Sequence, residues 1–103
     1  MKLLRVTLTI AAGLALSGNA MANLELAQKS ACMACHMVDK KLVGPSFKDV
    51  AAKYKGDGAA ETKLLKKVKE GGSGVWGQIP MPPNVNVKDE DLKKLVKWVL
   101  SQH

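Results

Sequence analysis

Two cysteines and a histidine stand close together at Cys32-Met33-Ala34-Cys35-His36, which is a C-x-x-C-H motif. This spacing is the attachment signature of a c-type haem. Two thiols three positions apart can each form a thioether with one haem vinyl group, and the next imidazole can then bind the iron. The ring nitrogen of His36 that does not bind iron needs a hydrogen-bond acceptor, which fixes the ring and raises its basicity.

Three other interpretations of these residues have less support from the sequence. A thioredoxin-like dithiol also has the C-x-x-C spacing, but it lies near a βαβ pattern that this sequence lacks. A disulfide that closes so short a loop would stabilise the domain little. A structural zinc site needs four ligands, and the sequence offers only Cys32, Cys35, His36 and His103. Haem attachment is therefore the favoured interpretation.

A second iron ligand would come from the methionines. After residue 22 these are Met33, Met37 and Met81. The first two are too close in sequence to His36 to reach the opposite face of a haem, and a methionine can also be simple core filler. Met81 is therefore the candidate for the distal position.

The residues around Met81 support this role. Pro80 and Pro82 fix φ on either side of it and stiffen the loop, which can hold a thioether sulfur against iron. Ligation by methionine and histidine suits electron transfer, and it fills both axial positions of the iron. His103 is a weaker alternative because a chain end is usually frayed.

The start of the chain is typical of a secretory signal peptide. Met1–Arg5 is basic, Val6–Leu16 is almost entirely apolar, and Ser17–Ala22 is small and polar with an A-x-A ending. An apolar stretch of this length is too short for a membrane anchor, which needs about 20 residues. We expect cleavage after Ala22, which leaves residues 23–103 as one monohaem domain.

A domain of 81 residues has a marginal core unless a cofactor, metal or disulfide supports it. The whole chain has 16 Lys+Arg and 9 Asp+Glu. Without Lys2 and Arg5, residues 23–103 carry 14 minus 9, or +5. Such a charge favours encounter with acidic protein surfaces. A nucleic-acid binder is the rival class, but four aromatic residues are too few for a stacking platform.

The hydrophobic periodicity predicts an all-α fold with about four short helices. Asn23 and Ser46 precede two of them and are suitable N-caps. The expected ranges are 24–31, 47–55, 59–69 and 89–101. Lysine runs on these helices are usually their solvated faces.

Residues 71–87 are rich in glycine and proline and show no helical period. A loop this long in a small domain is usually functional or disordered. It carries Val75, Trp76, Ile79 and Met81, which make it too apolar for a linker. We expect an ordered loop packed on something large and apolar.

The residues from position 23 onward resemble the small bacterial class I cytochromes c of the c-551/c-552 type. The C-x-x-C-H motif alone marks any cytochrome c, whereas the run from Gly74 to Asn84 is much more specific to this subgroup. The segments that carry the resemblance are Cys32–His36, Val43–Pro45, Asp49–Tyr54, Gly74–Asn84 and Lys97–Gln102.

The resemblance implies a small cytochrome c fold wrapped around one covalently attached haem c. Cys32 and Cys35 would form the thioethers. His36 would be the proximal iron ligand, with its other ring N–H donated to the Pro45 carbonyl. Met81 would be the distal ligand.

The resemblance also implies roles around the haem. Asn84 would donate a hydrogen bond near the Met81 sulfur, and Trp76 would hydrogen-bond a propionate. Lys67 lies where the family often has a basic partner for that propionate. Several relatives have arginine there, so a point charge would replace a planar fork. Lys88 also departs from the family, because it stands where a capping serine is common.

The implied function is a monomeric periplasmic single-electron carrier and not an enzyme. The resemblance suggests a cytochrome bc complex as the electron donor. It suggests a haem-cd nitrite reductase, a cytochrome c peroxidase or a terminal oxidase as the acceptor. No nucleic acid and no stable membrane insertion are expected. The rival functions are an open-site haem enzyme or gas sensor and a haem-free thiol module.

Overall fold

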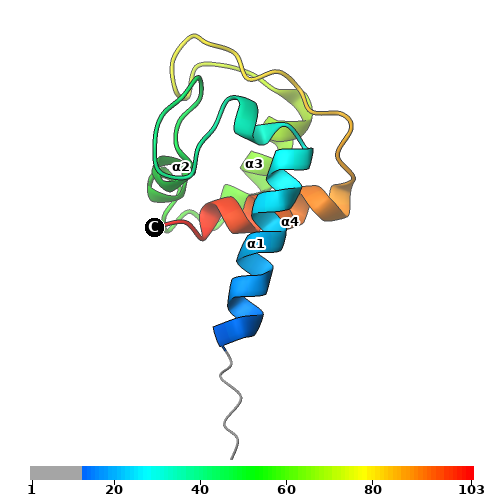
Figure 1. Cartoon of the computed structure of the whole chain (residues 1–103). Helices are drawn as coiled ribbons and strands as arrows, with labels where there is room; N and C mark the ends of the chain where they lie inside the picture. The colour runs from blue at the N-terminus through cyan, green and yellow to red at the C-terminus, as the bar shows by residue number, and fades with distance from the viewer. Residues whose placement is uncertain (1–12) are drawn as a thin grey trace, which may run out of the picture.

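The computed structural model describes residues 13–103, and within that range the chain is helical without a strand (Figure 1). The all-α prediction is confirmed. The elements are α1 (Gly13–Lys29), the 3-10 helix η1 (Cys32–Ala34), α2 (Phe47–Lys53), α3 (Ala60–Glu70) and α4 (Asp89–Leu100).

The last three helices match their predicted ranges to within two residues. The largest difference is at the end of α2, which stops at Lys53 instead of Lys55. The chain leaves the helix at Tyr54, and Gly56 then adopts a left-handed φ of 80°. Such a conformation is costly for other residues but easy for glycine.

The first helix differs more from the prediction. It begins at Gly13, so Asn23 lies inside the helix and is not its N-cap. No proline interrupts the residues before Asn23. The helix ends at Lys29, two residues before the predicted end, because Ala31 has a left-handed φ of 62°. This turn leads the chain directly into η1.

Residues 1–12, which hold the basic start of the predicted signal peptide, lie outside the described residues. Cleavage after Ala22 stays a prediction, and that position falls within α1. Among the described residues, no helix is both long and apolar enough to span a membrane.

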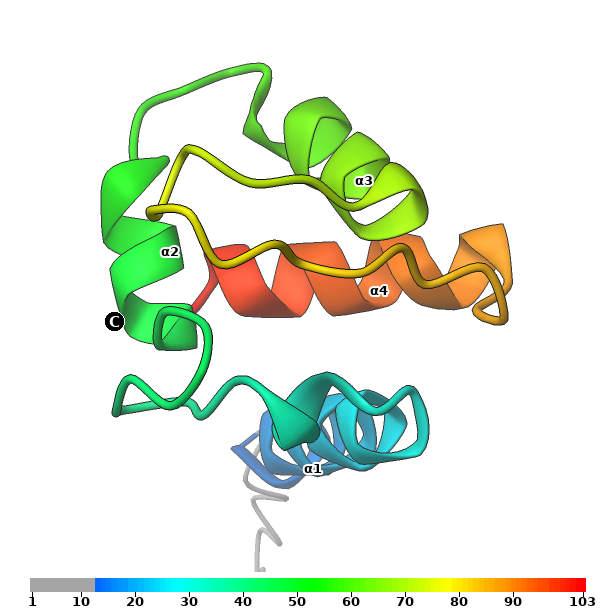
Figure 2. The same ribbon diagram turned by 90° about the horizontal axis from the view of Figure 1, so that it is seen from above.

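Helix α4 lies at the centre of the fold, between α1 and α3, with α2 beside one end (Figure 2). All three of these helices pack against it. Its apolar face is largely buried, and Trp98 is part of the core. The main cluster joins Trp98 and Leu95 of α4 to Phe47 of α2 and Ala27 of α1. Ala27 is fully buried, and its small side chain allows α1 to approach α4 closely.

The loop between α3 and α4 is held by backbone hydrogen bonds. The N–H of Gly72 donates to the Met81 carbonyl at 3.0 Å, and the N–H of Met81 donates to the Gly72 carbonyl at 2.8 Å. The N–H of Asn84 donates to the Val68 carbonyl at 2.8 Å. The backbone of Met81 is thus anchored to the residues that follow α3, which agrees with the expectation of an ordered loop.

Gly71 permits this close approach. Its φ is 71°, and a Cβ added to it would collide with the Met81 carbonyl oxygen. Beside this point, Lys69 of α3 forms an ion pair with Asp89 of α4 at 2.6 Å. The hydrogen bond from Lys69 lowers the pKa of the Asp89 carboxyl. Both side chains are exposed, so the pair adds little to stability.

The start of α2 is capped as predicted. Ser46 has an extended backbone, and its Oγ accepts a hydrogen bond from the Asp49 N–H at 3.0 Å. The serine is itself buried. The cap fixes where the chain enters α2, and the residues immediately before and after it contact the imidazole of His36, as described below.

We expect Ser46→Ala to lower the free energy of unfolding by about 1 kcal/mol, because the Asp49 N–H loses its acceptor. Denaturant titration of the purified protein measures this loss. Ser46→Gly is the matched control and should cost only a few tenths of a kcal/mol. A glycine variant as unstable as the alanine variant would contradict this capping role.

Candidate functional site

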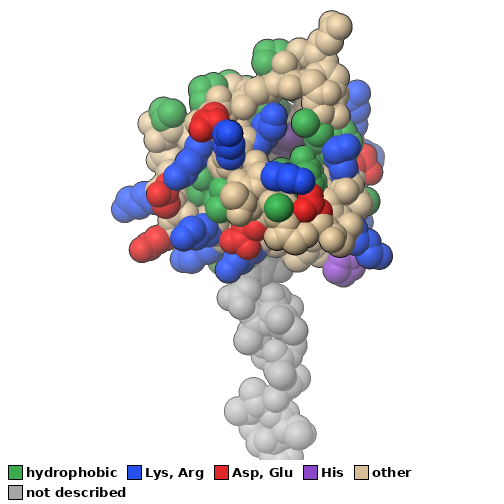
Figure 3. Space-filling model, turned by 180° about the vertical axis from the view of Figure 1, so that it is seen from behind, with side chains coloured by type: hydrophobic (Ala, Val, Ile, Leu, Met, Phe, Trp, Pro, Cys, Tyr) green, Lys and Arg blue, Asp and Glu red, His purple; other side chains and the backbone are tan. Residues whose placement is uncertain are grey.

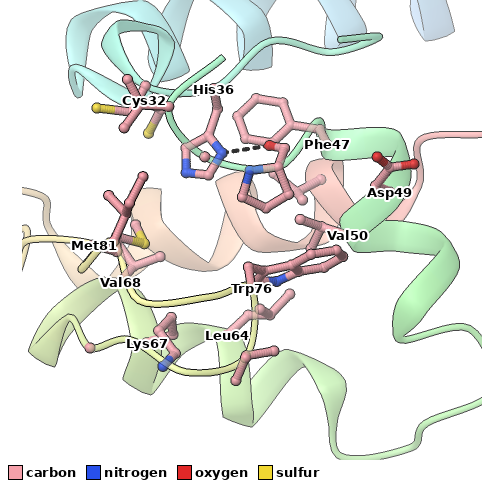
Figure 4. Close-up of a pocket in the computed structure, with 18 of the residues that line it drawn as sticks. Cys32, His36, Phe47, Asp49, Val50, Leu64, Lys67, Val68, Trp76 and Met81 are labelled. Carbon is pink, nitrogen blue, oxygen red and sulfur yellow. Dashed lines mark hydrogen bonds between the residues drawn. The ribbon is translucent and has the colours of Figure 1, made fainter. Parts of the chain in front are cut away.

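The described residues enclose a mainly apolar pocket of about 310 Å³. Residues from every part of the fold after α1 line it, including both motif cysteines, His36, Trp76, Lys67 and Met81. Figure 4 shows the imidazole of His36 and the thioether of Met81 projecting into the same space from different segments. The pocket thus brings together the predicted iron ligands and attachment residues.

The two cysteines lie at the start and just beyond the end of η1, and both are free thiols. Each lines the pocket. Burial raises the pKa of the Cys32 thiol, and a backbone hydrogen bond opposes this more weakly. A reactive dithiol needs a lowered pKa to form the thiolate, so the environment of Cys32 is unlike that of a thiol oxidoreductase.

The His36 imidazole is held by the loop before α2. Its Nδ1 lies 2.7 Å from the Pro45 carbonyl oxygen. A carbonyl only accepts hydrogen bonds, so Nδ1 must carry the proton and donate. In the neutral ring the other nitrogen, Nε2, then carries the lone pair, and this is the form that binds a metal.

Gly44 fits closely against the same ring. A Cβ added to Gly44 would lie 2.5 Å from Cε1 and 2.8 Å from Nδ1 of His36. Any side chain at this position would therefore displace the imidazole. The N–H of Gly44 donates to the Cys35 carbonyl at 2.7 Å, which ties this segment to the cysteine motif.

The three methionines after residue 22 have different environments. Met81 lines the pocket, Met33 packs against the core cluster, and Met37 is exposed. His103 is exposed at the end of the chain. Met81 is therefore the methionine that the fold brings into the same pocket as His36.

The residues predicted around a haem are partly brought together. Trp76 and Lys67 both line the pocket, and Lys53 of α2 places its ammonium 5.4 Å from the centroid of the Trp76 ring. Asn84 donates its side-chain N–H to the Ser30 carbonyl at 2.9 Å. The amide of Asn84 therefore links the Met81 loop to the turn before Cys32. Its proposed hydrogen bond to the Met81 sulfur stays a prediction, as do the propionate roles of Trp76 and Lys67.

Two contacts of His36 were not anticipated from the sequence. One is the approach of Gly44, for which the only signal was a glycine beside Pro45. The other is Phe47, the first residue of α2. Its ring stacks on the imidazole with centroids 5.3 Å apart.

The donor set fits a haem c. Two free thiols, an imidazole with an available Nε2, and a thioether border one pocket whose other walls are largely apolar. Val75, Trp76 and Ile79 of the loop line this pocket, although their side chains are well exposed. A large flat apolar group between the loop and the helices would cover these side chains.

The comparisons with known proteins agree with this fit. The family model for cytochrome c matches residues 24–103. The chain is 57% identical over 82 residues to cytochrome c-551 of Allochromatium vinosum, which covers 80% of this chain and 87% of that protein. It is 55% identical over 91 residues to cytochrome c-552 of Nitrosomonas europaea, which covers 88% of each chain.

The fold is similar to that of solved structures as well. The crystal structure of wild-type Nitrosomonas europaea cytochrome c552 matches with a TM-score of 0.75 and 56% identity. The match covers 78% of this chain and 99% of that one. The chain therefore belongs to the cytochrome c family and binds one haem c covalently.

Proposed function

We propose that this chain is a periplasmic single-electron carrier whose haem iron has His36 and Met81 as axial ligands. Family membership makes it a haem c electron carrier. We propose three further features that family membership does not establish: the axial ligands, the periplasmic location and the redox partners. The observation that carries the ligand assignment is the convergence of His36 and Met81 on one pocket, with Nδ1 of His36 held by the Pro45 carbonyl.

The protein holds both ligands through its backbone. The Pro45 carbonyl fixes the protonated nitrogen of the imidazole, and the bridge to Gly72 anchors Met81. When bound, the haem iron supplies one-electron chemistry by alternating between Fe(III) and Fe(II). Ligands anchored in this way need to move little when the charge changes, which favours fast electron exchange. With His36 and Met81 both bound to the iron, no coordination site would be open to a substrate, which disfavours the enzyme and gas-sensor alternatives.

The predicted signal peptide supports the periplasmic location. The lysines support partners with acidic surfaces, of the kind named above for the donor and the acceptors. Figure 3 shows lysine side chains spread over one face of the molecule, with acidic and apolar side chains between them. Lys41 and Lys67 line the pocket itself, so they are placed to guide a partner toward the haem edge.

We expect Gly44→Ala to displace the His36 imidazole, because the added Cβ would lie within 3.0 Å of three ring atoms. The variant should lose about 1–3 kcal/mol of stability, as overpacked cores do, and show a shifted reduction potential. Denaturant titration and potentiometry measure these effects.

Gly58→Ala is the matched control for this change, since a Cβ at Gly58 would have no neighbour within 4 Å. It should leave both the stability and the potential almost unchanged. Equal effects of the two substitutions would contradict the positioning of His36 by Gly44.

Met81→Ala should leave a folded haem protein with an open axial position. It should bind carbon monoxide in the reduced state, lose the weak far-red Met–iron absorption band, and have a lower reduction potential. Axial ligands set haem potentials over about 0.8 V, so we expect a fall on the order of 100 mV. Absorption spectroscopy and potentiometry measure these changes.

Met37→Ala removes an exposed methionine and is the matched control for Met81→Ala. It should keep the far-red band and exclude carbon monoxide. Ligand spectra of Met81→Ala that are identical to those of the wild type would remove Met81 from the iron.

Electron exchange with an acidic redox protein, such as a haem-cd nitrite reductase, should slow steeply with salt. The Debye length falls from about 30 Å at 0.01 M to about 3 Å at 1 M, and steering raises association rates by roughly 10–10³-fold. Stopped-flow kinetics across this range measure the effect.

Lys41→Gln at the pocket should reduce the salt dependence more than Lys93→Gln, which changes an exposed lysine on α4. A rate that does not respond to ionic strength would rule out steering by the lysines.

A further inference from the structure

We propose that Phe47 is a positioning residue that sets the rotation of the His36 imidazole, and through it the reduction potential. The proposal rests on the assignment of His36 as an axial ligand. It concerns the orientation of that ligand and assigns a role to a buried residue of α2.

The geometry of the two rings carries the proposal. Their centroids are 5.3 Å apart and their planes differ by 24°. This is a nearly parallel stack at a separation within the favourable range for aromatic pairs. Phe47 is only 5% exposed, so its ring is enclosed by protein.

Phe47 is itself held on its other sides. Its ring meets Trp98 edge to face, with centroids 5.4 Å apart and an angle of 72°. Trp98 belongs to the buried cluster of α4, and the N–H of Phe47 donates to the Met37 carbonyl at 2.9 Å. A line of three rings therefore joins His36 to the central helix.

The other contacts of the imidazole leave one motion open. The hydrogen bond from Nδ1 to the Pro45 carbonyl restrains one edge of the ring, but a single hydrogen bond leaves some freedom to turn about the Cβ–Cγ bond. Gly44 limits movement at the edge that includes Cε1. Phe47 lies against the face of the ring, so it is the contact that opposes tilting. Gly44, Pro45 and Phe47 together restrain the plane of the imidazole.

The plane of an axial imidazole determines which iron orbital receives its π electrons. In a ferric haem this shows as an uneven spread of the four haem-methyl proton resonances. A change in the plane therefore alters a spectroscopic signature that a simple loss of stability does not, and it also shifts the potential.

The test compares Phe47→Leu, which keeps much of the bulk but removes the aromatic face, with Phe47→Tyr, which keeps that face. Leu26→Ala is the control, because Leu26 packs against the same core cluster from α1. All are purified as haem-loaded proteins. Proton NMR of the ferric state, potentiometry and the far-red band are recorded for each.

The proposal predicts that Phe47→Leu changes the order or spread of the haem-methyl resonances and shifts the potential. Phe47→Tyr should keep the wild-type pattern, and Leu26→Ala should keep it despite a lower stability. A wild-type pattern in Phe47→Leu, or the same change in Leu26→Ala, would overturn the proposal.

A second measurement needs no variant. In the diamagnetic ferrous wild type, nuclear Overhauser cross-peaks between the Phe47 ring and the His36 imidazole protons are expected. Their absence would overturn the stack even if Phe47→Leu failed to accumulate. A ferrous wild type without any signals from an axial imidazole would instead refute His36 as the ligand. Failure of the stack and failure of the ligand assignment are therefore distinguishable.

Discussion

The packing of α1, α2 and α3 on the single helix α4 holds the walls of the pocket in place. α4 supplies much of the buried apolar surface, and Ala27, Phe47 and Trp98 close the cluster around it. So small a chain can bury only a limited core. The pocket lies against this core and is also lined by apolar side chains from the loop. A covalently bound haem in the pocket would therefore extend the apolar core.

The two sides of the pocket are built by different means. On the His36 side, residues 44–47 give a close backbone approach, a hydrogen-bond acceptor and an aromatic face within four positions. On the Met81 side, the loop is fixed by its bridge to Gly72. Asn84 connects this loop to the turn before Cys32 through the Ser30 carbonyl. Both sides use backbone hydrogen bonds: the Pro45 carbonyl holds the His36 imidazole, and Gly72 holds the Met81 backbone.

Much of this arrangement could be predicted from the sequence because it follows from spacing. The C-x-x-C-H motif predicted that two cysteines and a histidine act together, and the fold brings them to one pocket. Periodicity placed the last three helices to within two residues. Contacts between distant segments were not predictable in the same way. Two such contacts are the stack of Phe47 on His36 and the hydrogen bond from the Asn84 side chain to the Ser30 carbonyl. Both depend on the path of loops that have no hydrophobic periodicity. The long extent of α1 was also missed, because Asn23 was interpreted as an N-cap. No proline in the residues before Asn23 prevents the helix from extending further.

The most direct test of His36 and Met81 as iron ligands is the absorption spectrum of the exported wild-type protein, oxidised and reduced, with a pyridine haemochrome assay. We predict a c-type haemochrome, sharp bands in the reduced state, and the weak far-red Met–iron band in the oxidised state. A c-type haemochrome without the far-red band would contradict the assignment of Met81 and favour an open axial site.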